Sequence, residues 1–136
     1  MGAGGRIVVR FTDNSLTGSG NSDQDLWIFE IGPDVEDTFV DISKDGSTWF
    51  SVGAATGATQ GVDIDAFGFG TSDFFSFVRL TDNIALDAAS GPTVGADIDA
   101  VGAITSAPPV VGTVPEPATL LLVATAFALA AFKRRK

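Results

Sequence analysis

The sequence of 136 residues contains neither cysteine nor histidine. Without cysteine, the chain has no disulfide framework and no thiolate metal site. Without histidine, it lacks the usual general base and the commonest ligand of transition metals. These two absences exclude disulfide-stapled folds, zinc centres built from cysteine and histidine, and histidine-based catalysis.

Basic side chains are also scarce. Eight Lys and Arg residues oppose 17 Asp and Glu residues, which gives a formal net charge of −9. Four of the eight cations end the chain, so residues 1–132 carry four bases against 17 acids, a balance of −13. Such a surface repels nucleic acid and anionic lipid, so we expect no nucleic-acid partner. It suits a solvated extracellular domain that holds Ca²⁺ through oxygen ligands.

Residues 1–104 show strand patterns separated by turn signals, and no amphipathic helix. We therefore predict an all-β domain, an antiparallel β-sandwich or jelly roll. Loops rich in polar and small residues are expected at 13–25, 53–61 and 81–95. The predicted strands are residues 6–12, 26–31, 38–43, 48–52, 74–80 and 95–104, and a short strand or bridge is predicted at 62–70.

The clearest turn signal is the segment Lys44-Asp45-Gly46-Ser47. It lies between the alternating runs Thr38–Ser43 and Thr48–Val52. An Asp-Gly pair between such runs favours a hairpin, because glycine tolerates the positive φ that the turn requires. We expect these two strands to pair.

The end of the chain has three parts in a fixed order: an extended tetrapeptide, an apolar run and a basic cluster. A Pro-rich spacer, residues 105–113, precedes them. Prolines keep the tetrapeptide extended. The apolar run, residues 118–132, suits a transmembrane helix of about 22 Å, against roughly 30 Å of bilayer hydrocarbon. The tetrapeptide is Val114, Pro115, Glu116 and Pro117, and the basic cluster is Lys133, Arg134, Arg135 and Lys136.

This tail, residues 114–136, resembles the PEP-CTERM sorting signal of Gram-negative bacteria. The resemblance rests on Pro115-Glu116-Pro117, on the run Ala118 to Phe132 and on the cluster Lys133 to Lys136. It implies that an exosortase, a membrane protease, cleaves near the Pro-Glu-Pro. The protein would then pass from the inner membrane to the cell surface or the exterior, often in an exopolysaccharide context. The alternatives are an ordinary membrane anchor and a helix packed on the domain. The run is short for an anchor, and the cationic end is unsuited to burial.

The first residues do not have the pattern of an export signal. Met1–Gly5 has neither a cationic n-region nor an apolar h-region, and a strand pattern begins at Arg6. A surface-sorting tail is of little use without an export signal. We therefore expect a fragment, or a start placed too far downstream, whose missing part carries the signal peptide and the first strands.

Two segments resemble discoidin-type (F5/8 type C, galactose-binding-like) jelly rolls. Val40–Trp49 fits the hairpin pattern V-x-x-S-x-D-G-x-x-W of that family. Phe77–Thr81 fits its Y-V-R-L strand, with Phe77 in the place of tyrosine. The resemblance covers about Arg6 to Ile104 and lacks the earliest strands of the family. It implies a binding fold, often for glycans or surfaces, and often with a structural Ca²⁺.

The sequence contains an internal repeat, in which Gly61–Gly68 (GVDIDAFG) matches Gly95–Gly102 (GADIDAVG). Alternate residues of a strand share a face, so the two aspartates of each copy would point together, about 7 Å apart. Their charges repel unless a cation, an arginine or solvent compensates them. The functional interpretation is Ca²⁺ binding, and the alternative is a solvated edge strand whose charges prevent aggregation.

We predict the calcium site at the second copy of the repeat, at Asp97 and Asp99. The further ligands expected there are Asp13, Asn14 and Asp82. The first copy, Asp63 and Asp65, and the loop acids Asp13, Asp23 and Asp25 are alternatives. The spacing of an EF-hand loop is absent.

Other side chains allow competing functions. Trp27 and Trp49 can stack on a sugar ring, but we expect both in the core. Arg79, in an apolar strand, needs an acidic partner. Glu30 and Asp41 can be imagined as a glycosidase pair, although nothing in the sequence brings them together. We therefore predict a non-enzymatic exported protein, a structural or exopolysaccharide-associated matrix component. A carbohydrate-binding module is the alternative, and a hydrolase fragment is a third hypothesis.

Overall fold

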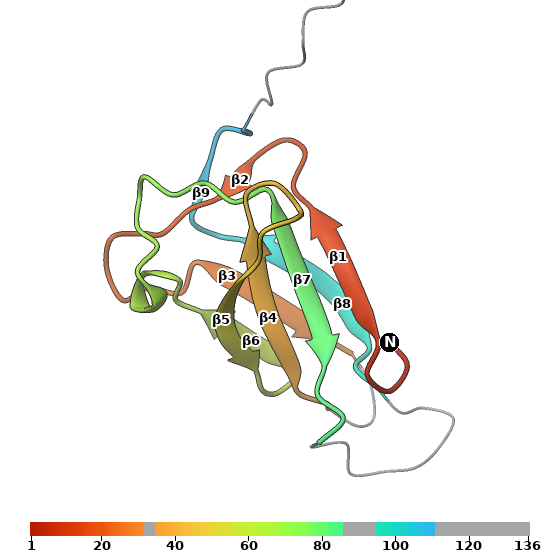
Figure 1. The fold of residues 1–136 in the computed structure, drawn as a ribbon. Helices are drawn as coiled ribbons and strands as arrows, with labels where there is room; N and C mark the ends of the chain where they lie inside the picture. The colour runs from red at the N-terminus through yellow and green to blue at the C-terminus, as the bar shows by residue number, and fades with distance from the viewer. Residues whose placement is uncertain (32–34, 86–94, 111–136) are drawn as a thin grey trace, which may run out of the picture.

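The computed structural model describes residues 1–31, 35–85 and 95–110, which form strands and one short 3-10 helix, η1 (Figure 1). All strand pairs are antiparallel, so the predicted all-β class is confirmed. The elements are β1 (Arg6–Arg10), β2 (Ser15–Leu16), β3 (Leu26–Glu30), β4 (Thr38–Ser43), β5 (Phe50–Ala55), β6 (Thr59–Val62), η1 (Asp65–Phe67), β7 (Phe77–Asp82), β8 (Ile98–Ala103) and β9 (Ser106–Ala107).

Two sheets share one hydrophobic core. One has the strand order β1-β7-β4-β5 and the other β6-β3-β8, while β2 and β9 form a small ribbon. In Figure 1 the three-stranded sheet lies behind the four-stranded one. The core cluster takes Val40 and Leu80 from the first sheet and Leu26 and Ile28 from the second. This layering is the arrangement that a β-sandwich requires.

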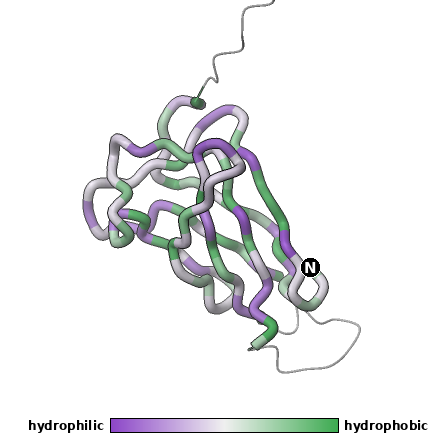
Figure 2. The backbone as a smooth tube through the Cα atoms, in the orientation of Figure 1, coloured by the Kyte–Doolittle hydropathy of each residue, from purple (hydrophilic) through white to green (hydrophobic). Residues whose placement is uncertain are grey.

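Side-chain alternation directs the core residues inward. In β7, Val78 and Leu80 are fully buried, whereas Arg79 between them is half-buried. In β4, Val40 and Ile42 are buried on the same period of two. Figure 2 shows hydrophobic and hydrophilic positions mixed along these strands. The pattern that predicted these strands from sequence is therefore the pattern that packs them.

The predicted hairpin is confirmed as the pair β4–β5. Gly46 adopts a φ of 78° in its turn, and its N–H donates to Ser43 Oγ at 2.9 Å. Asp45 Oδ1 accepts hydrogen bonds from the N–H groups of Thr48 and Ser47, both at 2.8 Å. These backbone donors, Thr48 first, hold the pKa of Asp45 well below its ordinary value.

Two very short strands escaped prediction from the sequence. Residues 13–25, expected as one loop, contain β2, and the expected spacer from residue 105 contains β9. Ser15 pairs with Ala107, and Leu16 pairs with Ser106. A strand of two residues carries too little alternation to be detected. The first part of the spacer therefore belongs to the fold.

The expectation of a short strand or bridge over residues 62–70 holds only for Val62 and is wrong beyond it. Strand β6 ends at Val62, and η1 follows at Asp65. The N–H of Gly68 donates to the carbonyl of Asp65 at 2.9 Å, and Gly68 has a φ of 87°. This left-handed glycine closes a tight turn that an extended strand cannot accommodate.

The predicted tail helix, residues 118–132, lies outside the described residues, as does the rest of the tail. Within the described ranges, no helix has the length and hydrophobicity needed to cross a membrane.

We expect Phe75→Ala to lower the free energy of unfolding by about 3–5 kcal/mol, because it opens a cavity in the core. Phe75 is fully buried, and its ring meets those of Phe69 and Phe50 with centroids 5.1 and 6.2 Å apart. Its neighbour Phe74 is 40% exposed, so Phe74→Ala is the matched control. Urea unfolding of the full chain measures the free energy of unfolding of both variants. An equal loss of stability in the two would contradict this packing.

We expect Asp45→Asn to lower the melting temperature at pH 7. The pKa of Asp45 lies lower in the folded state than its unfolded value of about 3.9. Its stabilising contribution is therefore complete above the unfolded value and declines as the pH falls through the folded-state value. The gap between wild type and variant should narrow from pH 7 to about pH 2. Thermal unfolding followed by circular dichroism tests this, and a gap that widens on acidification would contradict it.

Candidate functional site

Three carboxylates meet beside one end of the three-stranded sheet. Asp25 directly precedes β3, Asp63 directly follows β6, and Asp65 begins η1. Each contributes an oxygen, and these three oxygens all lie within 4.8 Å of one another. The cause is the register, because Leu26 of β3 pairs with Val62 of β6. The residue before one strand must then lie beside the residue after the other.

Asp25 is fully buried, and its backbone is held on both sides. Its N–H donates to the carbonyl of Val62 at 3.0 Å, and its carbonyl accepts from the N–H groups of Ile104 and Thr105 at 2.8 and 3.2 Å. In the side chain, Oδ2 accepts a hydrogen bond from the N–H of Ile64 at 3.0 Å. Oδ1 has no hydrogen-bond partner. Most buried polar atoms in proteins are hydrogen-bonded, so this oxygen requires an explanation.

Asp65 connects η1 to the loop that follows β2. Its Oδ2 accepts hydrogen bonds from the N–H of Gly20 at 3.1 Å and from Ser19 Oγ at 3.3 Å. The chain passes close by at Gly18, where an added Cβ would lie 2.7 Å from Asp65 Oδ2 and 2.2 Å from the carbonyl oxygen of Phe69. Only glycine permits this approach. Asp63 makes a looser contact, accepting from the N–H of Ala66 at 3.3 Å.

The cluster has no basic partner within the described residues. The ion pairs found there involve Met1 with Asp97, Lys44 with Asp73, and Arg79 with Asp41. None of them reaches Asp25, Asp63 or Asp65. Three carboxylates therefore lie together, one fully buried, with no compensating charge from the described part of the chain.

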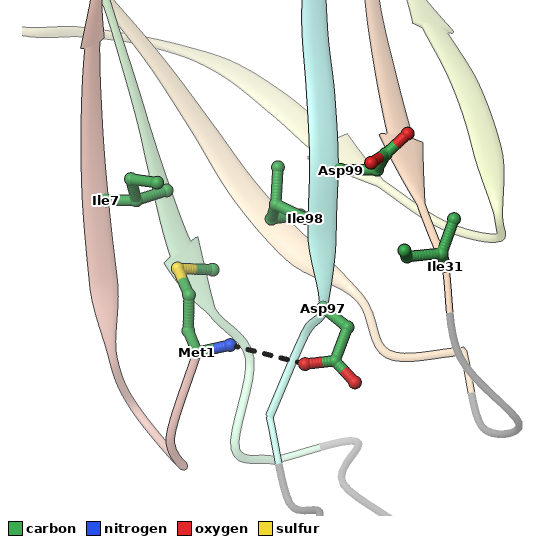
Figure 3. Close-up of a pocket in the computed structure, with 6 residues that line it drawn as sticks. All are labelled: Met1, Ile7, Ile31, Asp97, Ile98 and Asp99. Carbon is green, nitrogen blue, oxygen red and sulfur yellow. Dashed lines mark ion pairs between the residues drawn. The ribbon is translucent and has the colours of Figure 1, made fainter.

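The residues predicted to bind calcium lie elsewhere, and only some of them are neighbours. Asp97 is exposed and lies 3.9 Å from the amino group of Met1. Asp97 and Asp99 border a pocket with Met1, Ile7, Ile31 and Ile98 (Figure 3). The acids of the predicted set do not form a group of three within the described ranges.

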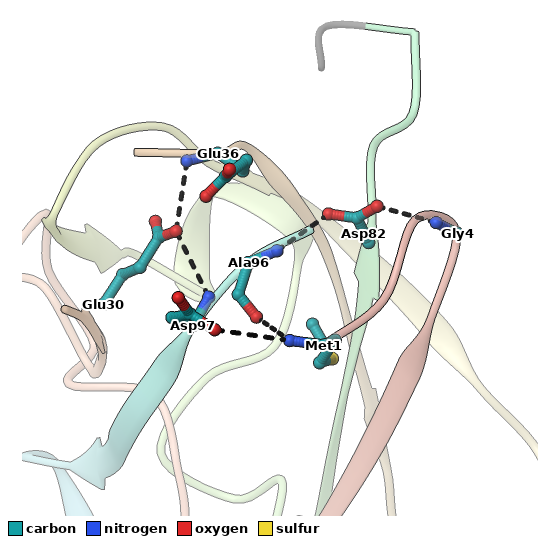
Figure 4. Close-up of polar contacts among 7 residues, drawn as sticks. All are labelled: Met1, Gly4, Glu30, Glu36, Asp82, Ala96 and Asp97. Carbon is teal, nitrogen blue, oxygen red and sulfur yellow. Dashed lines mark hydrogen bonds and ion pairs between the residues drawn. The ribbon is translucent and has the colours of Figure 1, made fainter. Parts of the chain in front are cut away.

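Asp82, from the same predicted set, joins two backbone segments. Its Oδ2 accepts from the N–H of Gly4 at 2.7 Å, and its Oδ1 accepts from the N–H of Ala96 at 3.1 Å (Figure 4). Both oxygens are thus engaged in the fold. Asp13 and Asn14 lie beyond the C-terminal end of β1. Asp97 lies near Met1, which precedes the N-terminal end of the same strand. A strand of five residues, about 16 Å long, separates the two places.

The imagined glycosidase pair is engaged in internal contacts. Glu30 is buried, and its Oε1 accepts hydrogen bonds from the N–H groups of Glu36 and Asp97 at 3.1 and 3.4 Å (Figure 4). Asp41 Oδ2 accepts from Arg79 Nε at 3.0 Å and lies 2.9 Å from its Nη2. The expectation that Arg79 needs an acidic partner is confirmed.

The two tryptophans are half-buried, so placing them in the core was wrong. In β3, alternation turns Leu26 and Ile28 inward, so Trp27 and Phe29 lie on the outer face, with stacked rings 6.5 Å apart. Trp49 lies beneath the guanidinium of Arg79, whose Cζ is 4.4 Å from the ring centroid.

Sequence reasoning named each member of the acidic cluster but did not predict that the three lie together. Asp63 and Asp65 stood out through the repeat, and Asp25 stood out as a loop acid. The missing signal was the pairing of β3 with β6, which joins residues almost 40 positions apart. If the pairing of Leu26 with Val62 had been predicted, the antiparallel register would have placed Asp25 beside Asp63.

Comparison with known proteins identifies the tail. Residues 113–136 match the PEP-CTERM protein-sorting motif. The motif marks this chain as an exported protein sorted by an exosortase. The predicted sorting signal and its export to the surface of a Gram-negative cell are thereby supported. No curated protein and no solved structure shows significant similarity to the chain. The discoidin-type resemblance of residues 6–104 therefore stays a prediction.

Proposed function

We propose that this exported protein is a non-enzymatic structural component of the cell surface or of an exopolysaccharide-containing matrix. The observation that carries the proposal is the match of residues 113–136 to the sorting motif, behind an acidic all-β domain. The net negative charge of the domain favours solubility, as expected for an exported protein.

The proposed delivery uses the three parts of the tail in order. The cations Lys133 to Lys136 keep the chain end on the cytoplasmic side. The run 118–132 crosses the inner membrane, and Val114 to Pro117 is presented to the exosortase at the outer boundary. Cleavage near Pro115-Glu116-Pro117 then releases the domain.

The engagement of the acidic residues supports a non-enzymatic role. A glycosidase needs two carboxylates facing its substrate. Glu30 accepts two backbone hydrogen bonds, and Asp41 is paired with Arg79. Their geometry is that of groups which hold the fold together.

For the domain itself, we propose the discoidin-type jelly roll. The two segments that carry this resemblance touch each other through Arg79, which comes from the F-V-R-L strand. Its guanidinium pairs with Asp41 and covers Trp49, both from the hairpin segment. This contact gives a physical reason for the two patterns to occur together, because an arginine between an acid and an aromatic face is stabilised by both.

A carbohydrate-binding module is the second candidate, and the outer face of β3 favours it. Trp27 pairs with Gly61 of β6 on one side and with Gly102 of β8 on the other. The two glycines contribute no side chain of their own, and the side chain of Gln24 lies over Gly61 instead. A tryptophan placed in this way next to Phe29 offers a flat aromatic surface on which a sugar ring can stack.

We expect Glu116→Ala to block processing, leaving an uncleaved form that is retained in the membrane. The physical reason is the loss of the only charged side chain in the Pro-Glu-Pro segment, and Thr119→Ala in the same tail is the control. Immunoblots of membrane and external fractions from an exosortase-containing host measure the outcome. Normal release of Glu116→Ala would count against recognition by the protease.

For the structural role, we expect no retention of the processed protein on isolated exopolysaccharide or simple glycans in a pull-down. A carbohydrate-binding module would be retained, and Trp27→Ala would abolish this retention while Phe39→Ala, at a 46% exposed position of β4, would not. Retention with that dependence on Trp27 would replace the structural proposal by the binding one.

A further inference from the structure

We propose that Asp25, Asp63 and Asp65 form a Ca²⁺ site. The proposal is independent of the sorting function and places the metal away from Asp97 and Asp99. The three carboxylates come from two segments: Asp25 directly precedes β3, whereas Asp63 and Asp65 lie on the stretch that leads from β6 into η1. Their oxygens lie within 4.8 Å of one another, a separation that one ion can bridge, because calcium–oxygen distances are about 2.3–2.6 Å.

The buried oxygen of Asp25 is the second, independent observation. A cluster of exposed acids needs no ion, since water solvates it. Asp25, in contrast, is fully buried, and its Oδ1 has no partner. Burial of a charge without a partner is unfavourable, and buried charges are normally paired or bound to a metal. A cation between the three side chains would coordinate Asp25 Oδ1 and would also compensate the negative charge of the three carboxylates.

The backbone shows that the arrangement is built into the fold. Asp25 is anchored by three backbone hydrogen bonds and by Oδ2 to the N–H of Ile64. Asp65 is oriented by the N–H of Gly20 and the hydroxyl of Ser19. Asp25 and Asp65 are therefore held in place by the fold, and each still has lone pairs for a metal.

The donor set selects a hard cation. All three ligands are carboxylates, and the chain has no cysteine or histidine to attract softer metals. Ca²⁺ accepts irregular sets of six to eight oxygens, whereas Mg²⁺ demands a near-ideal octahedron and retains its waters. Three carboxylates from two segments, with water completing the shell, fit Ca²⁺ better.

The ion would add a further link between segments that already contact one another. Besides the two strands, it would reach the loop around Ser19 and Gly20 through Asp65. Binding only to the folded state stabilises that state in proportion to the logarithm of ligand concentration. Calcium outside the cell would thus tighten this end of the domain after export.

The competing explanation is that no metal binds and that solvent alone compensates the carboxylates. It predicts that calcium has no effect on stability and that no calcium binds near neutral pH.

The test is a calcium titration of the full chain by calorimetry, combined with thermal unfolding in excess CaCl₂ or in EGTA. We expect one ion to bind and the melting temperature to rise with calcium. Asp63→Asn should weaken binding at least about tenfold, because it removes one ligand charge. This variant keeps the oxygen that accepts from Ala66, so it should still fold.

The melting temperature in the absence of metal shows whether these aspartates bind calcium or merely stabilise the fold. In EGTA, Asp63→Asn should melt at or above the temperature of the wild type, because one repelling charge has gone. Asp25→Asn should show the same signature if it folds. The matched controls Asp97→Asn and Asp99→Asn should retain the full response to calcium.

Several outcomes would overturn the proposal. These are the absence of binding heat, an unchanged calcium response in Asp63→Asn and Asp65→Asn, or a response that is lost in the Asp97 and Asp99 controls instead. An equal shift with MgCl₂ at the same concentration would overturn the assignment to Ca²⁺.

Discussion

The pairing of β3 with its two neighbours is the constraint on which the rest of the domain depends. Leu26 lies opposite Val62 on one side and Ala103 on the other, and it is fully buried. Because a shift by one residue would turn every side chain of a strand to the opposite face, this register is strongly specified. It decides that Asp25 meets Asp63 beyond the end of the pair, and that Trp27 lies between two glycines on the outer face.

The sorting tail and the folded domain depend on different features of the sequence. The sorting tail works through a linear order of residues, namely prolines, apolar residues and cations, which a membrane enzyme reads. The domain is held together by contacts between distant segments, such as Arg79 with Asp41 and Trp49. The first kind of feature is present in the linear sequence, whereas the second exists only when the sheets are assembled.

The strengths and failures of sequence reasoning follow from the same division. Alternation identified β4, because one of its faces is buried and the other is not. It missed β2 and β9, which are held by two residue pairs and need the folded sheets beside them. It extended a strand past Val62, because Asp63-Ile64-Asp65 alternates like a strand although a left-handed Gly68 closes a turn there. Trp27 was assigned to the core by its size, but the pleat turned it outward.

The sequence by itself determined the all-β class, the hairpin at Asp45-Gly46 and the sorting tail, because each of these is encoded by neighbouring residues. Only the tertiary structure decided which acids meet. Asp97 and Asp99 have the same local pattern as Asp63 and Asp65, yet the strand register places one copy beside a buried carboxylate and the other at a solvent-exposed pocket. Local sequence sets the face on which a side chain lies, whereas the partner across the sheet is set by chain segments tens of residues away.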